Sequence, residues 1–228
     1  MTTRRVEGVL LTGVYGSGKS SVAQEIAYLL EQRGEPFALL DLDYLSWAGT
    51  GNDDRAAEVG LMRQNLAAVT ANYRRAGIRL FVLAYFVRSS GEVQDVREAL
   101  GLPLRVVRLE VKLHDIERRL AGDVTSGRRD DLRAAASSIA AADGIGVEDV
   151  TIDNNRPIGV VARDVMTFLG WVLEGIGHYI KLAWIRRLRV TGIVKPFHRD
   201  LVTATDSRQV PELLVGCPNY LRLCSGCR

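Results

Sequence analysis

Residues 13–20 read Gly-Val-Tyr-Gly-Ser-Gly-Lys-Ser, which matches the pattern G-x-x-x-x-G-K-S/T. An apolar stretch, residues 6–12, comes directly before this segment, and an amphipathic stretch, residues 20–33, follows it. Glycines let such a turn wrap tightly, so its backbone N–H groups converge on an anion in front of a helix N-terminus. Lysine occurs only four times in the chain against 26 arginines, so Lys19 stands out at this position. The segment therefore predicts a phosphate-binding loop, or P-loop, between a strand and a helix.

The remainder of the chain alternates short apolar runs with helical periodicity. We expect strands at residues 6–12, 37–42, 78–87, 104–111 and 147–152. We expect helices at residues 20–33, 54–76, 90–100, 113–121, 131–142 and 157–171. Strands that alternate with helices of this length predict βαβ units and a parallel sheet. The fold class is therefore α/β, with three layers around a five-stranded parallel sheet.

Charge divides the 228 residues into two parts. Residues 1–174 carry 21 Lys and Arg against 24 Asp and Glu, whereas residues 175–228 carry nine against three. We therefore expect a nucleotide-binding domain at 1–174 and a basic C-terminal extension at 175–228. The extra positive charge is modest and dispersed, which favours a solvated surface over a nucleic-acid partner.

Composition indicates a globular protein, since 47% of the residues are hydrophobic and 25% are charged. Charged residues interrupt the apolar stretch 158–185, so it is a poor membrane span. The first residues lack an export signal, and three cysteines cannot build a disulfide framework. We therefore expect a cytoplasmic protein with no membrane partner, in which the three thiols have no assigned role: Cys217, Cys224 and Cys227.

The P-loop predicts that the chain binds ATP together with Mg²⁺. Lys19 would lie along the β- and γ-phosphates, and the Ser20 hydroxyl would be a ligand of Mg²⁺. The expected cofactor-binding residues of this segment are Gly13, Tyr15, Gly16, Ser17, Gly18, Lys19, Ser20 and Ser21.

Two carboxylates, Asp41 and Asp43, come at the end of the second predicted strand. Residues i and i+2 of a strand point the same way, so both would face the crevice at the carboxyl ends of the strands, where open α/β sheets bind ligands. Asp43 would orient an acceptor hydroxyl or take its proton, and Asp41 would hold a water of the Mg²⁺ shell. The alternative is that the two residues only cap the next element.

Two other P-loop classes are disfavoured. The chain has no Asn-Lys-x-Asp tetrapeptide for reading guanine, which argues against a GTPase. Its third predicted strand does not end in an acidic residue of the kind that motor and ring ATPases use around Mg²⁺.

Gly13–Ser20 followed by Asp41-x-Asp43 resembles the small P-loop kinases, among them adenylylsulfate kinase, shikimate kinase and chloramphenicol phosphotransferase. The resemblance extends over residues 6–172 and is greatest to uncharacterised bacterial adenylylsulfate-kinase-like proteins. It implies the P-loop NTPase fold with a small helical lid at about residues 113–142. It also implies that Arg118 of the lid and Asn155 and Arg156 of the late turn border the nucleotide, while Arg128 closes over the transferring group.

These features predict an ATP-dependent phosphotransferase that moves the γ-phosphoryl group to a hydroxyl of a small molecule. The acceptor stays open (a nucleoside, nucleotide, metabolite or antibiotic), because Tyr44-Leu-Ser-Trp47-Ala replaces the arginine-rich pattern of adenylylsulfate kinases. Tyr44 and Trp47 are candidates either to stack on the acceptor or to pack their helix onto the sheet. The alternative function is a non-catalytic ATP-binding switch with the basic extension as its contact surface.

Overall fold

The computed structural model describes residues 5–48, 54–122 and 146–171, with residues 127, 129, 130, 132, 133, 137 and 139 between them. Its elements are β1 (Glu7–Thr12), α1 (Lys19–Glu31), β2 (Phe37–Asp41), α2 (Asp43–Ser46), α3 (Arg55–Arg75), β3 (Leu80–Ala84), α4 (Ser90–Leu100), β4 (Leu104–Glu110), α5 (Leu113–Ala121), β5 (Val150–Asp153) and α7 (Ile158–Leu169). Most of the helix expected at 131–142, Arg128, and the whole of 175–228 with its cysteines lie outside the described residues.

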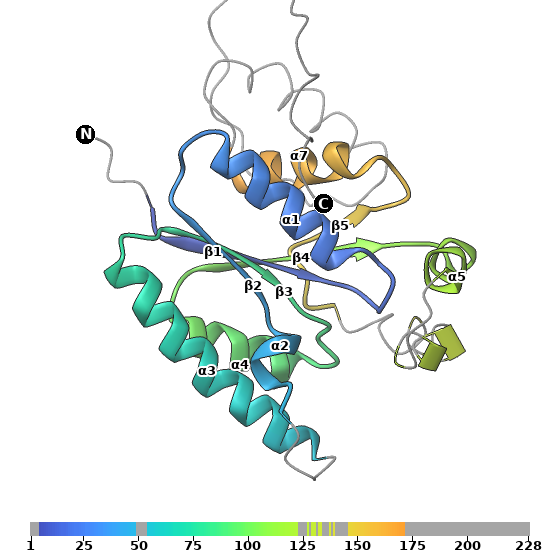
Figure 1. Ribbon diagram of the computed structural model, residues 1–228, viewed down its shortest axis with the longest axis horizontal. Coiled ribbons are helices and arrows are strands. Elements are labelled where there is room, and N and C mark those ends of the chain that lie inside the picture. The colour runs from blue at the N-terminus through green and yellow to red at the C-terminus, as the bar shows by residue number, and fades with distance from the viewer. Residues whose placement is uncertain are drawn as a thin grey trace, which may run out of the picture. The chain divides into compact units, whose positions relative to one another are not determined.

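The five strands form one parallel sheet in the order β2-β3-β1-β4-β5. Strand β1 is central, and its carboxyl end leads into the P-loop. Helices α1 and α7 cover one face of the sheet, and α3 and α4 cover the other (Figure 1). The predicted three-layer α/β fold around a five-stranded parallel sheet is therefore confirmed.

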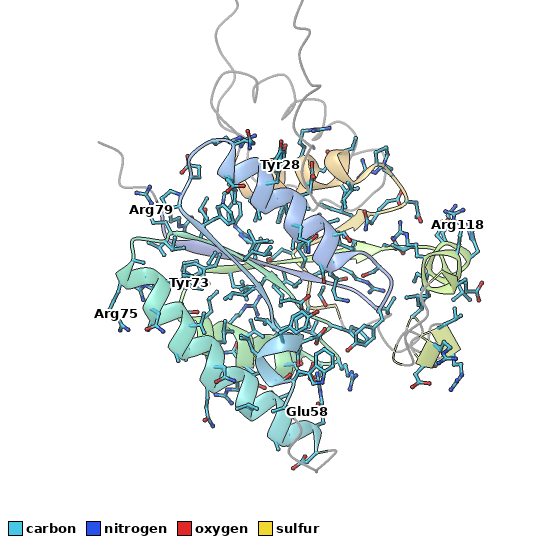
Figure 2. The ribbon with its side chains drawn as sticks, in the orientation of Figure 1. Tyr28, Glu58, Tyr73, Arg75, Arg79 and Arg118 are labelled. Atoms are coloured by element: carbon cyan, nitrogen blue, oxygen red, sulfur yellow. The ribbon has the colours of Figure 1, made fainter. Side chains whose placement is uncertain are left out.

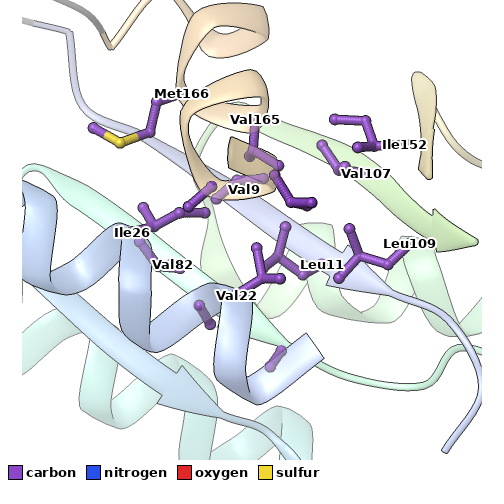
Figure 3. Packing of buried hydrophobic residues seen from close by; sticks show 14 of the residues in the cluster. Val9, Leu11, Val22, Ile26, Val82, Val107, Leu109, Ile152, Val165 and Met166 are labelled. Carbon is purple, nitrogen blue, oxygen red and sulfur yellow. The ribbon is translucent and has the colours of Figure 1, made fainter. Parts of the chain in front are cut away.

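Burial on both faces explains the apolar character of the central strands. Val9, Leu10 and Leu11 are all fully buried in β1. Val9 and Leu11 pack with α1 and α7, as Figure 3 shows, whereas Leu10 packs with α3 and α4. A strand covered by helices on both sides has no need of polar alternation, and its position fixes where the next turn, the P-loop, begins.

Several predicted boundaries differ from the structure by a few residues. The third strand, expected at 78–87, is shorter, because Tyr85 to Val87 leave the regular ladder although they stay buried. The fifth strand begins three residues later than expected, at Val150. Pro157 is the N-cap of α7 rather than its first helical residue. None of these shifts moves an element away from the P-loop edge of the sheet.

No helix in the described part of the chain is long and apolar enough to cross a membrane.

Candidate active site

The P-loop occupies the turn between β1 and α1 and depends on glycine. Gly18 has φ of 88°, a left-handed conformation that other residues adopt with strain. A Cβ atom at Gly18 would also lie 2.7 Å from Nδ2 of Asn154. Gly16 is equally confined, since a Cβ there would lie 2.9 Å from a methyl group of Ile116 on α5. The loop is therefore held closely from two sides, by α5 and by the turn after β5.

Lys19, the first residue of α1, is buried beside the loop, with 7% of its surface exposed. Its ammonium group donates to the carbonyl oxygens of Gly13 (2.9 Å) and Val14 (3.2 Å). It also stands over the rings of Tyr15 and Phe86, which meet edge to face. The structure thus places a cation inside the loop, next to the N-terminal N–H groups of α1 that have no acceptor within the helix.

Ser20 and Asp41 meet across the sheet edge. The Ser20 hydroxyl donates to Oδ2 of Asp41 at 2.7 Å, although the two residues are 21 positions apart. Oδ1 of the same carboxylate accepts from the backbone N–H of Asp43 at 3.3 Å. Asp41 therefore contacts the P-loop helix and also supports the start of α2. Its position fits both predicted roles, that of a residue beside the P-loop and that of a cap for the next helix.

The expectation that Asp41 and Asp43 point the same way from one strand is wrong, because β2 ends at Asp41 and Asp43 is the first residue of α2. The two residues are neighbours through a helical turn rather than through strand alternation. Burial raises the pKa of the half-buried Asp43 carboxyl, and Lys19 acts most strongly in the opposite direction. The negative charge of Asp41 adds to the rise in the pKa, whereas Arg55 and Arg88 lower it.

A cluster that the sequence interpretation missed lies near Asp43. Arg55, the first residue of α3, donates to the Tyr85 hydroxyl (2.8 Å) and to Glu92 of α4 (3.0 Å). Glu92 also accepts from the backbone N–H of Arg88 at 2.8 Å. Burial raises the pKa of Tyr85 to about 12, against the opposing effect of Arg55, so the phenol stays protonated at neutral pH. The cluster fixes the starts of α3 and α4 next to the carboxylates.

Of the two arginines at the end of α5, Arg119 contacts the P-loop, and the predicted role of Arg118 beside the nucleotide stays a prediction. The Arg119 guanidinium donates to the carbonyl oxygens of Asn154 (2.7 Å), Gly16 (3.3 Å) and Ser17 (3.4 Å). Arg118 instead pairs with Asp115 on its own helix at 2.5 Å and is 74% exposed. Figure 2 shows its side chain on the outer side of α5. The helical period of α5 could have shown which of the two arginines lies nearer the P-loop, had the apolar face of the helix been known.

In the turn after β5, Asn154 is buried, whereas Asn155, which was predicted to border the nucleotide, is exposed. The Asn154 amide donates to the Ser17 carbonyl oxygen at 2.6 Å. Asn155 is exposed and donates to Asp153. Arg156 donates to the Asp153 carbonyl oxygen and forms an ion pair with Asp164 at 2.7 Å. Asn155 and Arg156 therefore contact their own turn and α7, and their predicted role toward the nucleotide stays a prediction.

The other predicted site residues are divided between the core and the surface. Ser17 is fully buried and Ser21 is exposed on α1. Arg128 lies outside the described residues. Tyr44 and Trp47 are 69% and 80% exposed, so they do not pack α2 onto the sheet.

Comparison with known proteins places the fold. No family model matches the chain, and no curated protein matches its sequence. Among solved structures, an APS kinase from Mycobacterium tuberculosis, in complex with AMPPNP and APS, is 22% identical and has a TM-score of 0.57, over 73% of this chain and 98% of that one. A sugar kinase from Janibacter sp. is 18% identical, with a TM-score of 0.55, over 73% and 95%. A gluconokinase from Sinorhizobium meliloti is 21% identical, with a TM-score of 0.51, over 73% and 94%.

These neighbours are P-loop kinases of small molecules, and the chain has their fold. The resemblance inferred from the P-loop and the Asp-x-Asp segment is thereby confirmed at the level of fold. At such low identity, activity and acceptor do not follow from the likeness.

Proposed function

We propose that the protein is an Mg²⁺-dependent phosphotransferase that moves the γ-phosphoryl group of ATP to a hydroxyl of a small molecule. The observation that carries this proposal is the 2.7 Å contact of Ser20 with Asp41. Asp43 lies two residues after Asp41, and the positive charge of Lys19 lowers its pKa. Phosphoryl transfer requires groups that hold the phosphates, bind the metal and orient the acceptor, and a P-loop lysine with two carboxylates at one sheet edge can fill these roles.

The residues present fit a magnesium ion. Mg²⁺ prefers hard oxygen ligands and is usually bound by one or two carboxylates, with waters and substrate phosphates completing its shell. The Ser20 hydroxyl and the Asp41 carboxylate are such oxygens, and they already lie in contact. When bound, the ion would neutralise the charge that develops on the transferring phosphoryl group.

The chain's own residues would then divide the work of transfer. Lys19 would hold the phosphate oxygens, and Asp43 would orient the acceptor hydroxyl and take its proton. A raised pKa makes Asp43 a stronger base than an ordinary aspartate, and burial is the main cause of the rise in its pKa. Arg119 and Asn154 would keep the loop in shape from outside.

An acceptor screen tests the proposal. ADP release from Mg·ATP is measured across a library of hydroxyl compounds, with the wild-type protein and with Asp43→Asn. We expect turnover with at least one acceptor and a loss of about 10²- to 10⁴-fold in kcat for the variant, the usual effect of a positioned general base. Tight ATP binding without turnover for any acceptor would favour the non-catalytic switch.

A further inference from the structure

Tyr44 and Trp47 form an exposed aromatic pair beside the proposed base. They are 69% and 80% exposed, more than any other large hydrophobic side chain in the described part of the chain. Their rings are stacked on each other, with centroids 5.8 Å apart and planes at 27°. Two large aromatic rings side by side in water have a marked tendency to bind a partner, unlike isolated surface hydrophobics.

The helix that carries the pair is anchored and begins at the base itself. Asp43 is the first residue of α2, and Tyr44 and Trp47 follow it one and four positions later. Leu45 packs against the core under α3 and α4, and its carbonyl oxygen accepts from Asn65 of α3 at 2.6 Å. The inward side of α2 is therefore fixed, which leaves the two rings outward next to Asp43.

We propose that the Tyr44–Trp47 pair binds a flat, apolar ring face of the phosphoryl acceptor. This inference rests on the proposed function. Because Asp43 and Tyr44 are consecutive, a molecule whose hydroxyl meets Asp43 has its body within reach of the two rings. Indole and phenol rings bind flat apolar faces by stacking. In the described part of the chain both rings stay largely exposed, so their faces are open to such a ligand. The ring is either aromatic or the apolar face of a saturated sugar.

Ligand-observed NMR tests the proposal on the full chain, saturated with AMPPNP and Mg²⁺ so that no probe enters the nucleotide site. The probes are uridine, methyl β-glucopyranoside and ribitol, which offer an aromatic ring, a saturated ring and no ring. We expect at least one ring probe to bind and ribitol not to bind. Trp47→Ala should weaken ring binding on the order of tenfold, the scale of stacking on a protein aromatic ring.

Two control variants accompany Trp47→Ala. Trp47→Phe keeps a flat ring and should retain most of the binding. Tyr28→Ala removes an aromatic side chain that is 54% exposed on α1, on the other face of the sheet (Figures 1 and 2), and should bind as the wild type does. Uridine and the glucoside then distinguish an aromatic from a saturated ring.

Equal binding of ribitol, absence of binding by both ring probes, or full ring binding by Trp47→Ala would overturn the proposal. So would a wild-type dimer that Trp47→Ala converts to a monomer, because the pair would then be a contact between two copies of the chain. Ring binding that depends on Trp47, without ADP release for any acceptor, would show that the pair binds a ring but would refute the kinase function. Phosphoryl transfer to an acyclic acceptor at a rate that Trp47→Ala leaves unchanged would support the kinase function and refute the role of the aromatic pair.

Discussion

Replacing Asn154 by alanine should lower the stability of the protein and weaken ATP binding, because this side chain is hydrogen-bonded to the P-loop. Its amide donates to the Ser17 carbonyl oxygen at 2.6 Å in a buried position. After Asn154→Ala, the strongest remaining contact to that oxygen is the 3.4 Å approach of Arg119. A buried carbonyl that loses its partner costs about 1–3 kcal/mol. For a chain of this size, each kcal/mol lowers Tm by roughly 2–4 °C.

The same energy limits the effect on nucleotide affinity. If the whole 1–3 kcal/mol has to be recovered when the loop closes on phosphate, the Kd rises by about 5- to 150-fold. Urea unfolding and calorimetric titration with Mg·AMPPNP measure the two effects. Asn155→Ala is the matched comparison, since Asn155 is exposed and its contacts are with Asp153. Weaker nucleotide binding in Asn155→Ala than in Asn154→Ala would refute the reasoning and restore the role that the sequence suggested for Asn155.

Three further substitutions probe the rest of the site. Lys19→Ala should abolish turnover and weaken ATP binding at least tenfold in calorimetry, because it removes the buried cation of the loop. Asp43→Asn should not weaken ATP binding, and it should raise the free energy of unfolding at neutral pH, since burial disfavours the ionised carboxyl. Arg119→Ala should weaken ATP binding more than Arg118→Ala does. Equal effects of the two arginines would show that the contacts of Arg119 with the loop do not matter.

The sequence predicts the fold of this chain well because its strongest signals are local. An apolar run buried on both faces, a glycine-rich turn and a helical stripe occur next to one another, so β1, the P-loop and α1 follow from their neighbours alone. Ser89 is a further local signal. Serine is a preferred N-cap residue, and the Ser89 hydroxyl accepts from the backbone N–H of Glu92 at the start of α4.

The parts of the site that the sequence did not predict depend on contacts between distant segments. Arg55 follows Asp54, an ordinary N-cap, and only the packing of α3 against α4 brings it to Glu92, 37 residues later. Similarly, Arg119 and Asn154 differ from their neighbours only in which side of their segment faces the P-loop. Residue type and spacing cannot decide this without the orientation of α5 and of the turn after β5.

The charges around Asp43 lead to a last prediction, that nucleotide binding makes this residue a stronger base. Lys19 is the largest influence that lowers the Asp43 pKa, and Asp41 raises it. Phosphates held by Lys19 would offset its positive charge, so the pKa of Asp43 should rise further when AMPPNP binds. Asp43 then loses its proton at a higher pH, and activity should fall as pH decreases through that value. NMR titration of the Asp43 carboxyl with and without AMPPNP measures the shift. An unchanged or lowered pKa would show that Lys19 does not link the nucleotide to the base.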